Sequence, residues 1–119
     1  MKDDRELLEL AAKAAGIRPD TSQTNGGPSR NDGFVIAGNL VLDWHNCKVW
    51  NPLTDDGDAL RLAVKLSIAV YPPDNDSNDA TASAPYPPGE WITEQVGADP
   101  YAATRRAIVR AAAEIGRQR

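Results

Sequence analysis

Three carboxylates lie close together near the middle of the chain, where they could hold a metal ion. They are Asp55, Asp56 and Asp58. Oxygen ligands of this kind suit Ca²⁺ or Mg²⁺, and a metal-dependent enzyme acting on a phosphorylated or sugar substrate would use them in that way. The stretch lacks the calcium-loop pattern and its terminal glutamate. Acids in the first turn of a helix are also favoured by the helix dipole, so we expect these residues to start a helix and to hold no metal.

Two further pairs have the residue types of a catalytic site. His45 and Cys47 would share one face of a strand as a base and a nucleophile. No third polar group orients the histidine, however, and no helix N-terminus activates the thiol. Glu90 and Glu94 would also point the same way on a strand, but no second pair of acids faces them. We therefore expect a non-catalytic protein that uses no cofactor.

Arginines line one side of the C-terminal segment. On a helix Arg106, Arg110 and Arg117 fall within about 40° of one another, and Arg105 adds charge nearby. Guanidinium groups suit phosphate or carboxylate, so an anionic nucleotide is a candidate ligand of this stripe. The alternative is a solvated helix side, because Glu114 lies close to the stripe and basic residues near a helix C-terminus favour the dipole.

Aromatic side chains offer a second kind of binding surface. Trp44 and Trp91 stand near the ends of predicted loops, where they are candidates for exposed binding residues. Tryptophan anchors protein interfaces and stacks on bases. Trp50 is expected in the core, because a chain with one phenylalanine needs other large side chains to fill it.

Length and composition bound the kind of protein that carries these residues. The 119 residues are 41% apolar and 25% charged, which is typical of one globular domain spanning 1–119. A formal net charge of −4 argues against a general coat on duplex nucleic acid. No apolar run approaches the roughly 18 residues that a membrane-spanning helix needs. One cysteine excludes an internal disulfide, and a single histidine leaves too few ligands for a structural zinc site.

The elements that must position the candidate residues follow from periodicity and turn signals. Two stretches rich in Pro, Ser, Asn and Gly are predicted to be long loops, 18–33 and 72–90. β-Rich runs with turn signals predict three strands, the first two joined by the hairpin signal Gly38-Asn39: 34–37, 40–44 and 48–50. Weaker strand patterns follow at 67–71, 81–84 and 91–95.

Three helices complete the expected fold. The first begins at Asp3 and is ended by Gly16, and the last is capped by Asp99 with Pro100 in the first helical position. The second follows the three acids and includes 59–66. The fold class is therefore predicted to be α+β, with an antiparallel sheet of about four to six short strands between three helices.

The second helix has a wide apolar arc. Leu60, Ala63 and Val64 lie on one face, while Arg61 and Lys65 lie together on another. We expect the apolar face of this short helix to be well covered by the rest of the protein.

Three segments resemble a known family. They are residues 5–17 (RELLELAAKAAGI), 50–66 (WNPLTDDGDALRLAVKL) and 99–116 (DPYAATRRAIVRAAAEIG). They resemble small proteins of tailed bacteriophages and prophages that carry a phage ABA sandwich domain, over roughly half of the chain. The resemblance implies helices on both sides of a sheet and a phage or prophage setting, in the cytoplasm of an infected or lysogenic bacterium. It implies no reaction, because the family has no established general activity.

These observations together predict a phage accessory protein that works by binding. Its expected partner is a host protein, with inhibition of a bacterial defence protein as the natural role. One mechanism would place an acidic face in a basic nucleic-acid groove of the host protein. A second would hold an anionic nucleotide signal on the arginine stripe together with a tryptophan.

Overall fold

The computed structural model describes residues 4–18, 35–36, 39–43, 45–46, 48–73, 78–84 and 91–118. In chain order its elements are α1 (Asp4–Ala15), β1 (Val35–Ile36), β2 (Asn39–Asp43), β3 (Lys48–Trp50), α2 (Asp56–Leu66), β4 (Ala69–Tyr71), β5 (Asp79–Ser83), β6 (Trp91–Gln95) and α3 (Pro100–Arg117). The α+β class is confirmed. The predicted loop 72–90 is interrupted by β5, and most of the loop predicted at 18–33 lies outside the described residues.

The helix ends lie where local capping chemistry predicts them. Gly16 ends α1 with a φ of 72°, and the Ile17 N–H donates to the Ala12 carbonyl oxygen at 2.9 Å. Asp55 caps α2. Asp99 caps α3, because its carboxylate accepts the N–H of Tyr101 at 2.9 Å. The predicted cap Asp3 lies outside the described residues.

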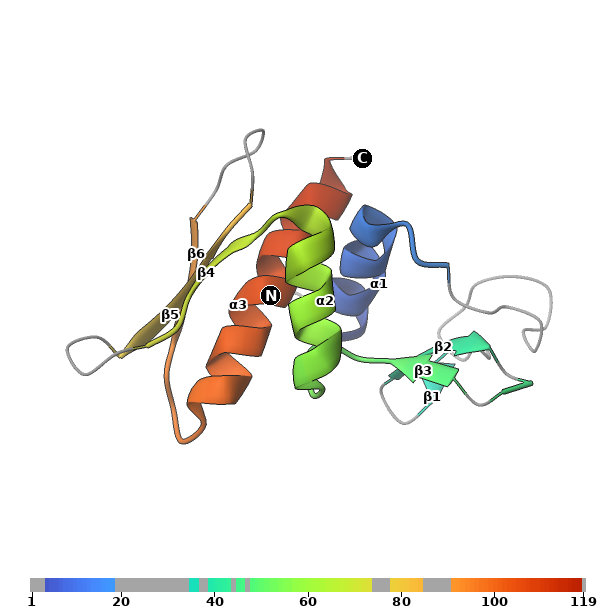
Figure 1. Ribbon diagram of the computed structural model, residues 1–119, viewed down its shortest axis with the longest axis horizontal. Coiled ribbons are helices and arrows are strands. Elements are labelled where there is room, and N and C mark those ends of the chain that lie inside the picture. Colours follow the sequence, from blue (N-terminus) through green and yellow to red (C-terminus); the bar gives the residue numbers. More distant parts are fainter. Residues whose placement is uncertain are drawn as a thin grey trace.

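The strands form two antiparallel sheets, with the orders β1-β2-β3 and β4-β5-β6. Figure 1 shows the helices between the two sheets, with α3 against β4–β6. The expectation of one sheet covered by helices on both sides is therefore wrong in its arrangement. Strand patterns reveal where a strand lies but leave its partner open, since pairing joins segments distant in sequence.

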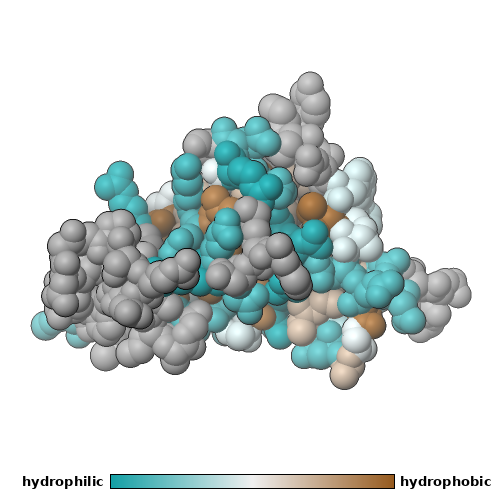
Figure 2. Space-filling model, turned by 180° about the vertical axis from the view of Figure 1, so that it is seen from behind, coloured by the Kyte–Doolittle hydropathy of each residue, from teal (hydrophilic) through white to brown (hydrophobic). Residues whose placement is uncertain are grey.

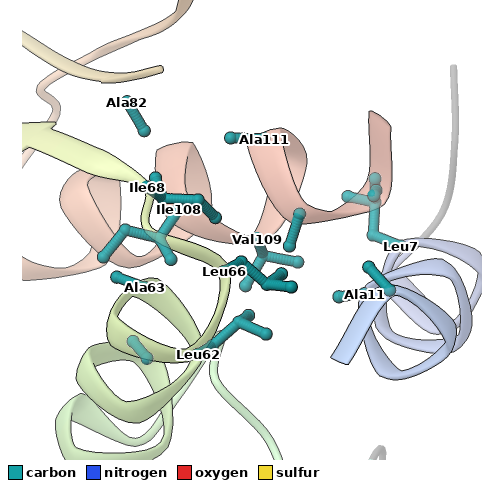
Figure 3. Close-up of a cluster of buried hydrophobic side chains, with 14 of the residues drawn as sticks. Leu7, Ala11, Leu62, Ala63, Leu66, Ile68, Ala82, Ile108, Val109 and Ala111 are labelled. Carbon is teal, nitrogen blue, oxygen red and sulfur yellow. The ribbon is translucent and has the colours of Figure 1, made fainter. Parts of the chain in front are cut away.

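Small side chains let α3 approach its neighbours closely. Ala80 and Ala82 alternate with polar residues along β5, and they are fully buried where α3 crosses the sheet. On another side α3 meets α1 at Gly116, where an added Cβ would lie 2.0 Å from the Leu10 carbonyl oxygen. The helical core is completed by larger side chains, among them Leu62 of α2 and Val109 of α3 (Figure 3).

Among the described residues, no helix has the length and apolar content that crossing a membrane requires.

Candidate functional site

The three acids near the start of α2 serve the local structure. The Asp55 carboxylate accepts the N–H of Asp58 at 2.7 Å and so caps α2, which confirms the expectation that these acids start a helix. Asp58 accepts the Asn51 N–H at 3.0 Å and pairs with Arg61 at 2.8 Å. Asp56 pairs with Arg105 at 2.6 Å. Within the described part of the chain, no three His, Cys, Asp or Glu side chains are grouped as metal ligands would be.

Arg105 joins α3 to the start of α2, a role that sequence spacing did not indicate. Its Nε donates to the Leu53 carbonyl oxygen at 2.8 Å, and its Nη1 donates to Asp56. Asp99 lies 4.0 Å away on the other side. The side chain is only 15% exposed. The hydrogen-bonded partners are 49 and 52 residues away in the sequence, so only the tertiary fold reveals this junction.

The arginine stripe is paired with carboxylates of the same chain. Arg106 lies 3.0 Å from Asp4 of α1 and 3.7 Å from Glu94 of β6. Arg110 also pairs with Glu94, and Arg117 pairs with Glu114 at 3.2 Å, although Glu114 belongs to the same helix. An anionic nucleotide would have to displace these carboxylates.

The surface seen from behind is mainly hydrophilic where it is coloured, with hydrophobic residues in separate small areas (Figure 2). The side chains of Arg106, Arg110 and Arg117 are 30%, 40% and 43% exposed, and ion pairs that solvent reaches contribute little to stability, typically about 0–1 kcal/mol each. These pairs therefore hold the arginine side chains in place more than they stabilise the fold.

The remaining candidates are only partly described. Trp91 is 61% exposed, as expected, and Trp50 is buried, as expected. Trp44, Cys47 and Glu90 lie outside the described residues. His45 lies in a turn, where its N–H donates to an Asp43 carboxylate oxygen at 3.0 Å.

The expectation that the apolar arc of α2 is covered is wrong for two of its residues. Ala63 is buried, but Leu60 is 64% exposed and Val64 is 71% exposed. The helix buries a different stripe toward α3, formed by Ala59, Leu62, Ala63 and Leu66. An apolar arc wider than the contact with the core leaves one of its sides in solvent.

An apolar groove lies beside this exposed side, between α2, the end of β4 and the start of α3. We refer to it as the α2–α3 groove; its volume is about 540 Å³. Its lining is Asp56, Ala59, Leu60, Val70, Pro72, Pro73, Pro100, Tyr101, Thr104, Arg105 and Ile108. Leu60 and Tyr101 are both exposed at its walls, and the Arg105–Asp56 pair forms its polar part. No sequence signal pointed to it, because its walls come from three separate segments.

Comparison of the chain with family models, with curated proteins and with solved structures finds no match. The likeness to phage ABA sandwich proteins thus has only the three quoted segments as its basis.

Proposed function

We propose that this protein acts by binding a partner protein through the α2–α3 groove, without catalysing a reaction. The observation that carries the proposal is an apolar groove of about 540 Å³ whose walls include the exposed side chains Leu60 and Tyr101. Grooves of this size and polarity hold apolar ligands or the anchoring side chains of a partner.

The energetic argument rests on the exposed apolar residues. Complete burial of a Leu or Val side chain stabilises by roughly 1.5–3 kcal/mol. A partner that covers Leu60 and Val64 would gain part of that free energy, while the unbound protein leaves both in water. The Arg105–Asp56 pair would orient a polar group of the partner next to its apolar anchor.

The charged candidates give less support to the two alternatives, a metal-dependent reaction and a nucleotide sponge. Asp55, Asp56 and Asp58 cap α2 or pair with arginines. A nucleotide sponge on Arg106, Arg110 and Arg117 finds less support, because each of these arginines has a carboxylate partner in the chain.

In the phage setting that the resemblance implies, the partner is a host protein and the role is inhibition of a defence protein. The protein would then act in the cytoplasm of the infected or lysogenic bacterium. Salt separates an apolar docking mode from an acidic face that occupies a basic groove. Apolar docking changes little with ionic strength, whereas the acidic mode weakens steeply with added salt.

The test is capture from a bacterial lysate with tagged wild-type protein and the variants Leu60→Gln, Tyr101→Ala and Val49→Gln. Val49 is exposed on β3 and does not line the groove, so Val49→Gln is the matched control. We expect wild type and Val49→Gln to capture the same host protein, and both groove variants to lose it. Equal capture by all four proteins, or capture lost only with Val49→Gln, would refute the proposal.

A further inference from the structure

The two faces of the β4–β6 sheet differ in what covers them. Side chains alternate along β5, so that Ala80 and Ala82 are buried toward α3 while Thr81 and Ser83 lie on the opposite face. The register extends that outer face to both neighbouring strands, where it carries Ala69, Tyr71, Trp91, Thr93 and Gln95. We refer to these residues with Asp79, Thr81 and Ser83 as the outer sheet face. No helix of the described chain covers it, as Figure 1 shows.

Two aromatic rings meet in the middle of this face. Tyr71 pairs with Thr81, and Trp91 pairs with Ser83, so the rings reach toward each other diagonally across β5. Their centroids are 5.4 Å apart and their planes are inclined by 38°. Contact with a neighbouring ring restricts both side chains, yet Tyr71 and Trp91 remain more than half exposed. The result is an ordered aromatic surface that the described part of the chain leaves open to solvent.

The rings are surrounded by neutral hydrogen-bonding groups. The Thr81 and Thr93 hydroxyl oxygens lie 3.3 Å apart, Ser83 adds another hydroxyl, and Gln95 lies exposed at the end of β6. Asp79 is the one charged residue that the described strands place on this face, and no Lys or Arg is among them.

This composition selects the ligand by charge and by polarity. A nucleic acid or an anionic lipid would meet one carboxylate and no cation here, which disfavours both. An apolar protein surface would bury the exposed amide of Gln95 and the one hydroxyl donor that the Thr81–Thr93 hydrogen bond leaves unused, which costs free energy for each group. A neutral molecule with apolar C–H faces and hydroxyl edges fits both the rings and the polar groups.

We propose that the outer sheet face binds a neutral carbohydrate chain. A pyranose ring stacks its C–H face on Trp91 and Tyr71, and its hydroxyl groups exchange hydrogen bonds with Thr93 and Gln95. This surface shares no residue with the α2–α3 groove, so a result that refutes one proposal leaves the other unaffected.

The experiment is titration calorimetry with two neutral hexasaccharides, one of β-1,4-linked glucose and one of β-1,4-linked N-acetylglucosamine. The proteins are wild type, Trp91→Ala, Thr93→Val and the control Val49→Gln, which changes an exposed residue outside both this face and the α2–α3 groove. We expect at least one hexasaccharide to bind wild type and Val49→Gln alike. Trp91→Ala is expected to weaken binding by about tenfold or more, and Thr93→Val, which keeps the side-chain shape, by a smaller factor.

Three results would overturn the proposal. One is that neither hexasaccharide binds wild type, and another is that binding persists unchanged in Trp91→Ala. The third is a dependence on Trp91 shown only by a heparin hexasaccharide, by a single-stranded thymidine oligonucleotide or by self-association in sedimentation. That last result would assign the face to an anion or to a second copy of the chain.

Discussion

Replacement of Gly116 by alanine tests how closely α1 and α3 approach. An ideal Cβ at this position would lie 2.0 Å from the Leu10 carbonyl oxygen and 2.8 Å from its carbonyl carbon. Both atoms belong to the backbone of α1, so no side-chain rotation relieves the overlap. The helices must separate, and the core residues Leu7 and Val109, which lie between them, lose contact.

The expected loss combines two opposing terms. Overpacking of a tight core costs typically 1–3 kcal/mol, and sometimes more when the backbone must move. Alanine regains about 1 kcal/mol relative to glycine within a helix. Because the overlap at Gly116 is with backbone, the first term should lie at or above the top of its range. We therefore expect Gly116→Ala to lower the free energy of unfolding by about 2 kcal/mol or more.

Gly57→Ala provides the matched control, since Gly57 also lies in a helix. Its added Cβ would lie 3.2 Å from the end of the flexible Arg61 side chain and 3.2 Å from Oδ2 of the capping Asp55, so only side-chain atoms need to shift. The helix propensity gained and the small displacement of the cap oppose each other, and this variant should change stability by less than about 1 kcal/mol. The assay is urea unfolding followed by circular dichroism at 222 nm. If Gly116→Ala were as stable as Gly57→Ala, the close crossing of α1 and α3 would be refuted.

Three further changes test the junctions described above. Arg105→Leu should lower the free energy of unfolding in urea by about 1–2 kcal/mol, because the Leu53 carbonyl loses its donor. The control Arg61→Leu replaces an exposed arginine and should change stability by less than about 0.5 kcal/mol. Equal losses in the two variants would contradict the role of Arg105 as a junction. Asp99→Ala should lower the free energy of unfolding by about 1 kcal/mol because it removes the cap of α3, whereas Asp99→Asn should keep most of the stability that the cap contributes. An Asp99→Ala variant as stable as wild type would show that the cap contributes nothing. Ser67→Gly should raise the thermal midpoint, because Ser67 has a φ of 56° that glycine adopts without strain; a lower midpoint would argue against this geometry.

Features that depend on neighbours in sequence were predictable, and those that depend on distant segments were not. The start of α2 at the acids, the cap at Asp99 and the stop at Gly16 follow from a few adjacent residues, and all three were confirmed. Arg105 and Arg110 find their partners through the tertiary fold, so their positions on a helical stripe alone suggested an open cationic surface.

The apolar arc of α2 is a second feature that depends on distant segments. Leu60 and Val64 have the residue types of a core, and periodicity places Ala63 on their side of the helix. Which part of a wide arc is covered depends on where α3 and β4 lie. The hydrophobic periodicity of the α2 sequence does not contain that arrangement. The division of the strands into two sheets is a pairing choice of the same kind.

The contacts of α3 explain why its arginines do not form an open cationic surface. One side of this helix packs on α1 through Gly116, and another packs on the sheet. Its arginines lie on the flanks between these contacts, within reach of Asp56 at the start of α2, of Glu94 on β6 and of Asp4 on α1. A helix so placed uses its cations to link its neighbours, because each neighbour presents a carboxylate beside it. Both binding proposals therefore rest on apolar and aromatic side chains outside these ion pairs, namely Leu60 and Tyr101 at the groove and Trp91 on the outer sheet face.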